Sequence, residues 1–155
     1  MKRLLLSLSL IIYYLSFNPV WAYAQAGLKI NELFEGRIIP QERLIETRVR
    51  GKTLEKYRLT YYRSVRLSVT NEESLLLHQL LSKDSARSID MRSYRKNPHR
   101  WDTWTCKLQM PPSGSKNCYL CYQEQWKKTD YLREVTIIYM EGNVASLGEL
   151  EELLK

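Results

Sequence analysis

The stretch Tyr57–Leu81, YRLTYYRSVRLSVTNEESLLLHQLL, contains two hydrophobic periodicities that meet at one residue. Before Thr70, mostly apolar residues occupy the odd positions and mostly polar residues the even ones, which is the pattern of a half-buried strand. After Thr70 the leucines recur at helical spacing, and Thr70 with Glu73 has the composition of a capping box. The stretch therefore predicts a strand followed directly by a helix that ends near Asp84.

The residues before this stretch predict a hairpin partner for its strand. Residues 43–49 alternate in the same way and are separated from residues 57–69 by a turn at Gly51. We therefore expect residues 43–69 to form a β-hairpin whose odd positions face the core. Arg63 interrupts that apolar face, which we interpret as a bulge or a strand end. The outward face is expected to carry a basic group of residues: Arg48, Arg50, Arg58 and Arg66.

The second half of the chain predicts three more strands and a short helix. Residues 101–110, 118–126 and 132–140 alternate, and Pro111–Gly114 is a strong turn signal between the first two. Ser146 begins a second capping-box sequence ahead of a leucine-rich C-terminal helix. The predicted fold class is α+β, with a mostly antiparallel sheet of about five strands and two helices in the order β-β-α-β-β-β-α. We expect both helices on one side of the sheet.

Residues 1–24 have the features of a signal peptide. A basic start precedes an apolar run, and residues 22–24, Ala-Tyr-Ala, match the small-residue cleavage site of a signal peptidase. The apolar run is shorter than the roughly 20 residues that cross a bilayer as a permanent helix, so an uncleaved anchor is the less favoured alternative. We expect cleavage after Ala24, no transmembrane segment after cleavage, and a single α+β domain over residues 25–155 in the periplasm or outside the cell.

The composition of the mature chain disfavours several classes of partner and of chemistry. The leader carries two of the 24 Lys and Arg residues and none of the 17 Asp and Glu residues, which leaves a net charge of +5. That excess is smaller than a nucleic-acid surface usually requires, so no nucleic-acid partner is expected. The chain also lacks a phosphate-binding glycine loop and a Gly-x-Ser-x-Gly motif, which disfavours nucleotide chemistry and a hydrolase triad. We expect no cofactor.

The main binding candidate is a basic and aromatic stretch after the first helix. We interpret residues 85–100 as a short strand at best, followed by an exposed loop. Arginine binds carboxylates and phosphates through paired hydrogen bonds, and tryptophan stacks on sugars and rings. An anionic glycan, an anionic lipid or an envelope protein would fit, and the alternative is a solvated loop. The candidate ligand-binding residues are Arg92, Arg95, Lys96, Arg100 and Trp101.

Three cysteines allow at most one internal disulfide in an oxidising compartment. A turn at residues 111–114 places Cys106 nearly opposite Cys118, which predicts a disulfide between them, with two buried reduced thiols as the alternative. Cys118 and Cys121 have the spacing of a redox pair, but strand alternation points them to opposite faces. A zinc site that includes His99 is disfavoured because Tyr-Leu between the paired cysteines is poor turn chemistry, so we expect no metal.

Five short motifs combine turn glycines, strand residues and a helix cap: Gly51-Lys52, Tyr57-x-Leu59-Thr60, Tyr62-Arg63-Ser64, Val135–Gly142 and Ser146-x-x-Glu149-Leu150. Together they resemble small exported proteins of Bacteroidota that are grouped as families of unknown function. The resemblance implies the envelope of a Gram-negative bacterium and carries over no catalytic residue. We therefore expect a non-catalytic envelope protein that binds or scaffolds a partner. The alternative is a small periplasmic enzyme with its site in the segment His99 to Cys121.

Overall fold

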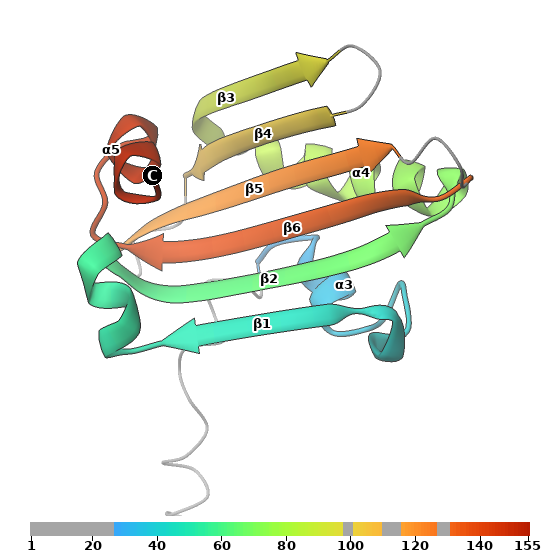
Figure 1. Cartoon of the computed structure of the whole chain (residues 1–155), viewed down its shortest axis with the longest axis horizontal. Coiled ribbons are helices and arrows are strands. Elements are labelled where there is room, and N and C mark those ends of the chain that lie inside the picture. The colour runs from blue at the N-terminus through green and yellow to red at the C-terminus, as the bar shows by residue number, and fades with distance from the viewer. Residues whose placement is uncertain (1–26, 98–100, 110–115, 127–130) are drawn as a thin grey trace, which may run out of the picture.

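Six antiparallel strands form one sheet in the order β1-β2-β6-β5-β4-β3 (Figure 1). The computed structural model describes residues 27–97, 101–109, 116–126 and 131–155. The α+β class and the antiparallel sheet predicted from the sequence are confirmed. The strands are β1 (Ile45–Arg50), β2 (Leu59–Val69), β3 (Ser88–Asn97), β4 (Trp101–Leu108), β5 (Asn117–Trp126) and β6 (Arg133–Gly142).

Helices cover both faces of this sheet, so the expectation of helices on one side is wrong. Tyr119 and Leu120 are neighbours on β5 and therefore point to opposite faces. Leu120 shares a buried cluster with Leu77 of one helix, and Tyr119 shares another with Leu147 of a second helix. We call these faces the α4 face and the α5 face. The helices are α3 (Asn31–Phe34), α4 (Asn71–Ser85) and α5 (Leu147–Leu153), with the 3-10 turns η2 (Gln41–Arg43) and η3 (Lys52–Tyr57).

The α4 face is covered along most of its length. Figure 1 shows α4 and α3 behind the strands, where α3 lies beneath β1 and β2. The carboxylate of Asp84 accepts hydrogen bonds from the backbone amides of Lys29 (2.7 Å) and Ile30 (2.8 Å), which ties the segment before α3 to the end of α4. Within the described part of the chain, no helix is both long enough and apolar enough to cross a membrane.

Both predicted helix starts are confirmed by their caps. The side chain of Thr70 accepts a hydrogen bond from the Glu73 amide, and the Glu73 carboxylate accepts one from the Thr70 amide, so a complete capping box begins α4. At α5 the Ser146 hydroxyl accepts from the Glu149 amide, but the Glu149 carboxylate accepts from the amide of Ala145 instead of Ser146. These local hydrogen bonds therefore begin both helices at the residues that the sequence pattern indicates.

Strand β3 was not predicted at its full length. Residues 85–100 lack the apolar alternation of the other strands, yet Ser88–Asn97 pairs with β4 along its length. Because β3 is an edge strand, its apolar side chains are not buried: Ile89 is 58% exposed and Met91 is 46% exposed. Residues 88–93 therefore show no alternation of buried and exposed side chains. The sheet therefore has six strands instead of about five.

The predicted first hairpin is present, but two of its details are wrong. Thr47 of β1 lies opposite Ser64 of β2, so the odd residues of β1 share a face with the even residues of β2, and Ile45 is 69% exposed. Arg63 is neither a bulge nor a strand end: it is buried in mid-strand, where its guanidinium donates to the carbonyl of Phe34 (2.9 Å). The register shift of β2 lies between Leu59 and Tyr61.

Candidate ligand-binding groove

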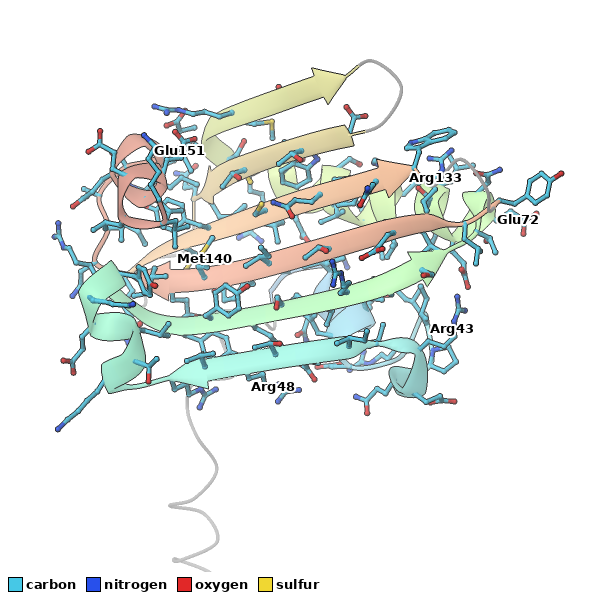
Figure 2. All side chains as sticks on the ribbon, viewed as in Figure 1. Arg43, Arg48, Glu72, Arg133, Met140 and Glu151 are labelled. Carbon is cyan, nitrogen blue, oxygen red and sulfur yellow. The ribbon has the colours of Figure 1, made fainter. Side chains whose placement is uncertain are left out.

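The α5 face is covered at one end only, and a groove of about 540 Å³ lies where the cover stops. Figure 2 shows Met140 on β6 and Glu151 on α5 at the same end of the sheet. The volume is within the roughly 300–1,000 Å³ range of small-molecule sites. Among the described residues the groove is lined by Tyr62, Thr103, Thr105, Cys121, Gln123, Ile138, Met140, Leu150, Glu151, Leu154 and Lys155.

Four adjacent strands supply the floor of the groove. Thr105 lies opposite Cys121, and Cys121 lies opposite Ile138, so one row of side chains crosses β4, β5 and β6. Met140 and its partner Tyr62 on β2 continue the floor toward the buried end. Strand alternation places all of these side chains on the α5 face. The floor is therefore apolar where β6 contributes Ile138 and Met140, and polar where β4 contributes Thr103 and Thr105.

Helix α5 forms the wall of the groove and is held by buried leucines and by ion pairs. Leu147 and Leu150 are buried in the cluster that contains Tyr119 and Met140. At the other side of the helix, Arg92 Nη1 on β3 lies 2.7 Å from Glu151 Oε2. By contrast, Leu154 has no such cover: it is 50% exposed at the groove. The wall thus has a fixed base and an apolar rim that is open to solvent.

Among the described residues, the polar side chains of the groove floor are neutral. Burial raises the pKa of the Cys121 thiol, and a hydrogen bond with Thr105 opposes this shift without cancelling it. The thiol is therefore protonated at neutral pH and is a poor nucleophile. Thr103, Thr105 and Gln123 offer hydroxyl and amide groups that donate and accept hydrogen bonds. This set can orient a polar group on a ligand, but it supplies no charged partner in the floor.

A second polar cluster lies on the α4 face, around Glu124 of β5. Glu124 is 2% exposed, and its carboxylate accepts hydrogen bonds from Tyr122 (2.8 Å), Arg133 (2.8 Å) and Ser74 (3.3 Å). His78 Nε2 lies 3.2 Å from the same carboxylate. Burial raises the pKa of Glu124, but the hydrogen bonds from His78, Arg133 and Tyr122 outweigh it and hold the pKa at about 2.

This cluster joins elements rather than presenting a reactive carboxylate. Glu124 is ionised and its oxygens are occupied, so it is not available as a general base. Ser74 and His78 come from α4, and Arg133 comes from β6, so the carboxylate connects a helix to two strands. Sequence reasoning did not pair these residues. The available signal was a charged residue at an inward position, because Glu124 continues the even-numbered apolar face of β5.

The predicted basic site is only partly within the described structure. Arg92 is paired with Glu151, so its charge already has an acidic partner. Arg95 and Lys96 lie on β3 and Trp101 begins β4, but their side chains lie outside the described part, as does Arg100 altogether. The strand continues to residue 97, so it is longer than the short strand predicted ahead of the loop. An anion-binding role for these five residues stays a prediction.

The second predicted basic surface, on the first hairpin, does not form. Arg48 lies directly opposite Arg63 and so shares the α4 face, whereas Arg66 lies on the α5 face. Arg48 pairs with Glu46 and Arg66 pairs with Glu134. Because β1 is offset by one position relative to the expectation, the outward arginines are divided between the two faces.

In the register of β4 and β5, Cys106 and Cys118 are offset by two residues and do not lie opposite each other as predicted. Cys106 lies opposite Leu120, and Cys118 lies opposite Leu108, so the two cysteines are diagonal neighbours on the α4 face. Diagonal neighbours are about 7–8 Å apart, which exceeds the usual Cα separation of a disulfide. All three cysteines are free and buried, and Cys121 lies on the opposite face, as predicted. The described residues contain no group of three or more His, Cys, Asp or Glu that could hold a metal ion.

Comparison with known proteins identifies a family but no activity. No curated protein matches the chain. The crystal structure of human STARD10 is matched with 12% sequence identity over 78% of this chain and 69% of that chain, at a TM-score of 0.25, which is too low to support a shared fold. A family model described as a family of unknown function, DUF6108, matches residues 17–154. The chain therefore belongs to the DUF6108 family.

Proposed function

We propose that this protein is a binding module for a small, mostly apolar ligand that carries a neutral polar group. The observation that carries the proposal is the groove of about 540 Å³ between α5 and the uncovered part of the sheet. Its floor changes from apolar at Ile138 and Met140 to hydroxyl-bearing at Thr103 and Thr105. A ligand with an apolar body and one hydrogen-bonding end would match both parts.

Binding is favoured over catalysis by the chemistry of the groove. The segment proposed for an enzymatic site, His99 to Cys121, does contribute Thr103, Thr105 and Cys121 to the floor. However, burial keeps the Cys121 thiol protonated by raising its pKa, and the remaining floor groups are hydroxyls and an amide. A nucleophilic site needs a nucleophile that a neighbouring base or charge activates. The groove supports recognition of a polar group more directly than it supports bond cleavage.

We also propose that the protein acts in the periplasm or outside the cell. This proposal rests on residues 1–24, whose basic start, apolar run and Ala-Tyr-Ala ending have the composition of a cleaved signal peptide. The resemblance to exported Bacteroidota proteins adds the envelope of a Gram-negative bacterium as the expected compartment. The ligand would then come from the envelope or from the medium.

The groove can be tested with N-phenyl-1-naphthylamine, an uncharged apolar probe whose fluorescence rises on burial. Gln123→Trp should fill the polar end of the groove and abolish the fluorescence increase. Leu154→Ser should remove part of the apolar rim and weaken binding by about 3- to 10-fold, because burying the exposed half of a leucine side chain contributes on the order of 0.7–1.4 kcal/mol.

Two control variants match these changes outside the groove. Ser68→Trp adds the same side chain at an exposed position of the α5 face, and Leu75→Ser makes the same change on the exposed side of α4. Both should bind the probe like the unmodified protein. Equal probe binding by Gln123→Trp and Ser68→Trp, with both folded by circular dichroism, would remove the groove as the site.

A further inference from the structure

A second pocket, of about 450 Å³, lies on the opposite side of the sheet from the groove. Tyr61 and Glu141 line it and are directly opposite each other on β2 and β6. Tyr61 and Tyr139, two residues before Glu141 on β6, belong to the buried cluster of the α4 face, so this pocket and the groove share no face. The described residues that line it are Arg50, Thr60, Tyr61, Lys116 and Glu141.

Arg50 brings a positive charge to this pocket. Its guanidinium lies over the ring of Tyr61, 4.7 Å from the ring centroid. Within the described residues no carboxylate is in ion-pair contact with it, whereas the neighbouring Arg48 pairs with Glu46. A guanidinium that lies over an aromatic ring keeps the N–H donors at its own edge, in the guanidinium plane, available for a carboxylate. Lys116 adds positive charge to the same pocket.

Glu141 brings a negative charge that is held in place. Its Oε1 accepts a hydrogen bond of 2.8 Å from the hydroxyl of Tyr139, and the residue is 8% exposed. The described part of the chain offers no hydrogen-bond donor to Oε2. The Tyr139 ring in turn packs edge-on against Tyr61, with the centroids 6.2 Å apart. The carboxylate is thus fixed on one side and open on the other.

We propose that this pocket binds a small zwitterion of the amino-acid type, which carries a carboxylate and an ammonium group. Arg50 would hold the carboxylate through paired hydrogen bonds, and Glu141 would accept from the ammonium group. Tyr61 lies between the two charges in the sheet, with Arg50 as its partner on β1 and Glu141 as its partner on β6. The two charges face the same pocket without neutralising each other, which is the arrangement that a doubly charged, net-neutral ligand completes.

Three probes that each carry a phenyl group test the contributions of Arg50 and Glu141 separately. L-phenylalanine has both groups, 3-phenylpropionate lacks the ammonium group, and 2-phenylethylamine lacks the carboxylate. By isothermal titration calorimetry, L-phenylalanine should bind at least about 10-fold more tightly than either analogue, since each analogue loses a charged hydrogen-bonding group. Binding of L-phenylalanine should also weaken as salt concentration rises.

Two variants assign the charges to residues. Arg50→Gln should lower L-phenylalanine affinity by at least about 10-fold and leave 2-phenylethylamine unchanged, because that probe has no carboxylate to lose. Glu141→Gln should also lower L-phenylalanine affinity by at least about 10-fold, and it should leave the affinity for 3-phenylpropionate unchanged, because that probe has no ammonium group to lose. Arg48→Gln is the matched control, since it removes a charge from the same face of β1 outside the pocket, and its affinities should not change.

The outcome for Arg50 decides the proposal even where Glu141→Gln is too unstable to assay. Arg50 is exposed on an edge strand, so Arg50→Gln is expected to fold. Equal affinities for all three probes, or equal losses in Arg50→Gln and Arg48→Gln, would overturn the zwitterion site. The groove variant Gln123→Trp should leave L-phenylalanine binding intact, which keeps this test separate from the test of the proposed function.

Discussion

Arg92 Nη1 lies 2.7 Å from Glu151 Oε2, and this ion pair connects the edge strand β3 to the helix that walls the groove. The two residues are 59 positions apart in the chain. The side chains are 43% and 32% exposed, so solvent screens the pair and its contribution to stability is small, on the order of 0–1 kcal/mol. We expect its larger effect to be on the position of α5 over the groove.

Replacing Arg92 should therefore affect the groove more than the fold. We expect Arg92→Gln to weaken N-phenyl-1-naphthylamine binding while the melting temperature falls by no more than about 4 °C. Arg66→Gln is the matched control, because it breaks the exposed ion pair with Glu134 on β6 and leaves α5 untouched. Probe titration and thermal unfolding of both variants check this. If Arg92→Gln and Arg66→Gln bound the probe with the same affinity, the ion pair between Arg92 and Glu151 would not position α5.

The buried carboxylate of Glu124 predicts a loss of stability in acid. Because its folded-state pKa, about 2, lies below the ordinary value of 4.5, its stabilising contribution is complete above pH 4.5 and is lost as the pH falls toward 2. That difference corresponds to about 3 kcal/mol of unfolding free energy. Urea unfolding at pH 7 should show Glu124→Gln destabilised by an amount of that order.

The Glu124 variant should also change how stability depends on pH. Between pH 4.5 and pH 2 its unfolding free energy should fall less steeply than that of the unmodified protein, since one depressed carboxyl pKa has been removed. Glu152→Gln, at an exposed position of α5, serves as the control and should follow the unmodified protein. Parallel pH profiles for the protein with and without Glu124 would contradict the assigned network.

The three thiols should react slowly in the native protein. Burial raises the pKa of Cys106 to about 12 and also raises the pKa values of Cys118 and Cys121. Few thiolates are therefore present at pH 8, and a thiol reagent should modify the cysteines only on unfolding. Ellman's reagent with and without guanidinium chloride measures this difference.

Non-reducing peptide mapping tests the Cys106–Cys118 bond predicted from the sequence. The diagonal register favours three free thiols, so we expect three alkylated cysteines after unfolding without a reductant. Alkylation of Cys121 alone would establish the bond and would require β4 and β5 to move relative to each other.

Processing of the leader should produce a mature chain that begins at Gln25. The reason is the small-residue site at Ala22 and Ala24 behind a short apolar run. N-terminal sequencing of protein recovered from the soluble envelope fraction checks this prediction. Recovery of the chain with Met1 intact in the membrane fraction would instead identify an uncleaved anchor.

The strands and caps could be predicted because they depend on neighbouring residues. Alternation along β2 and the Thr70 capping box are local patterns, and both are confirmed. Strand β3 and the orientation of β1 could not be predicted in this way. The apolar side chains of β3 stay exposed, so its sequence has no alternation to read, and alternation alone does not say which of two faces each set of side chains takes.

The two sites required contacts between distant parts of the chain. The apolar leucines of α5 indicated an amphipathic helix, but only its packing on Tyr119 and Met140 placed it on the face opposite α4 and left the groove beside it. Likewise, the sequence shows Arg50 and Glu141 only as charged residues in or next to predicted strands, and the pairing of both with Tyr61 brings them to one pocket. Periodicity along the chain thus determined most of the helices and strands and their caps. Strand order and register across the sheet decided which side chains meet. The sequence pattern does not contain this information, because those pairings join residues far apart in the chain.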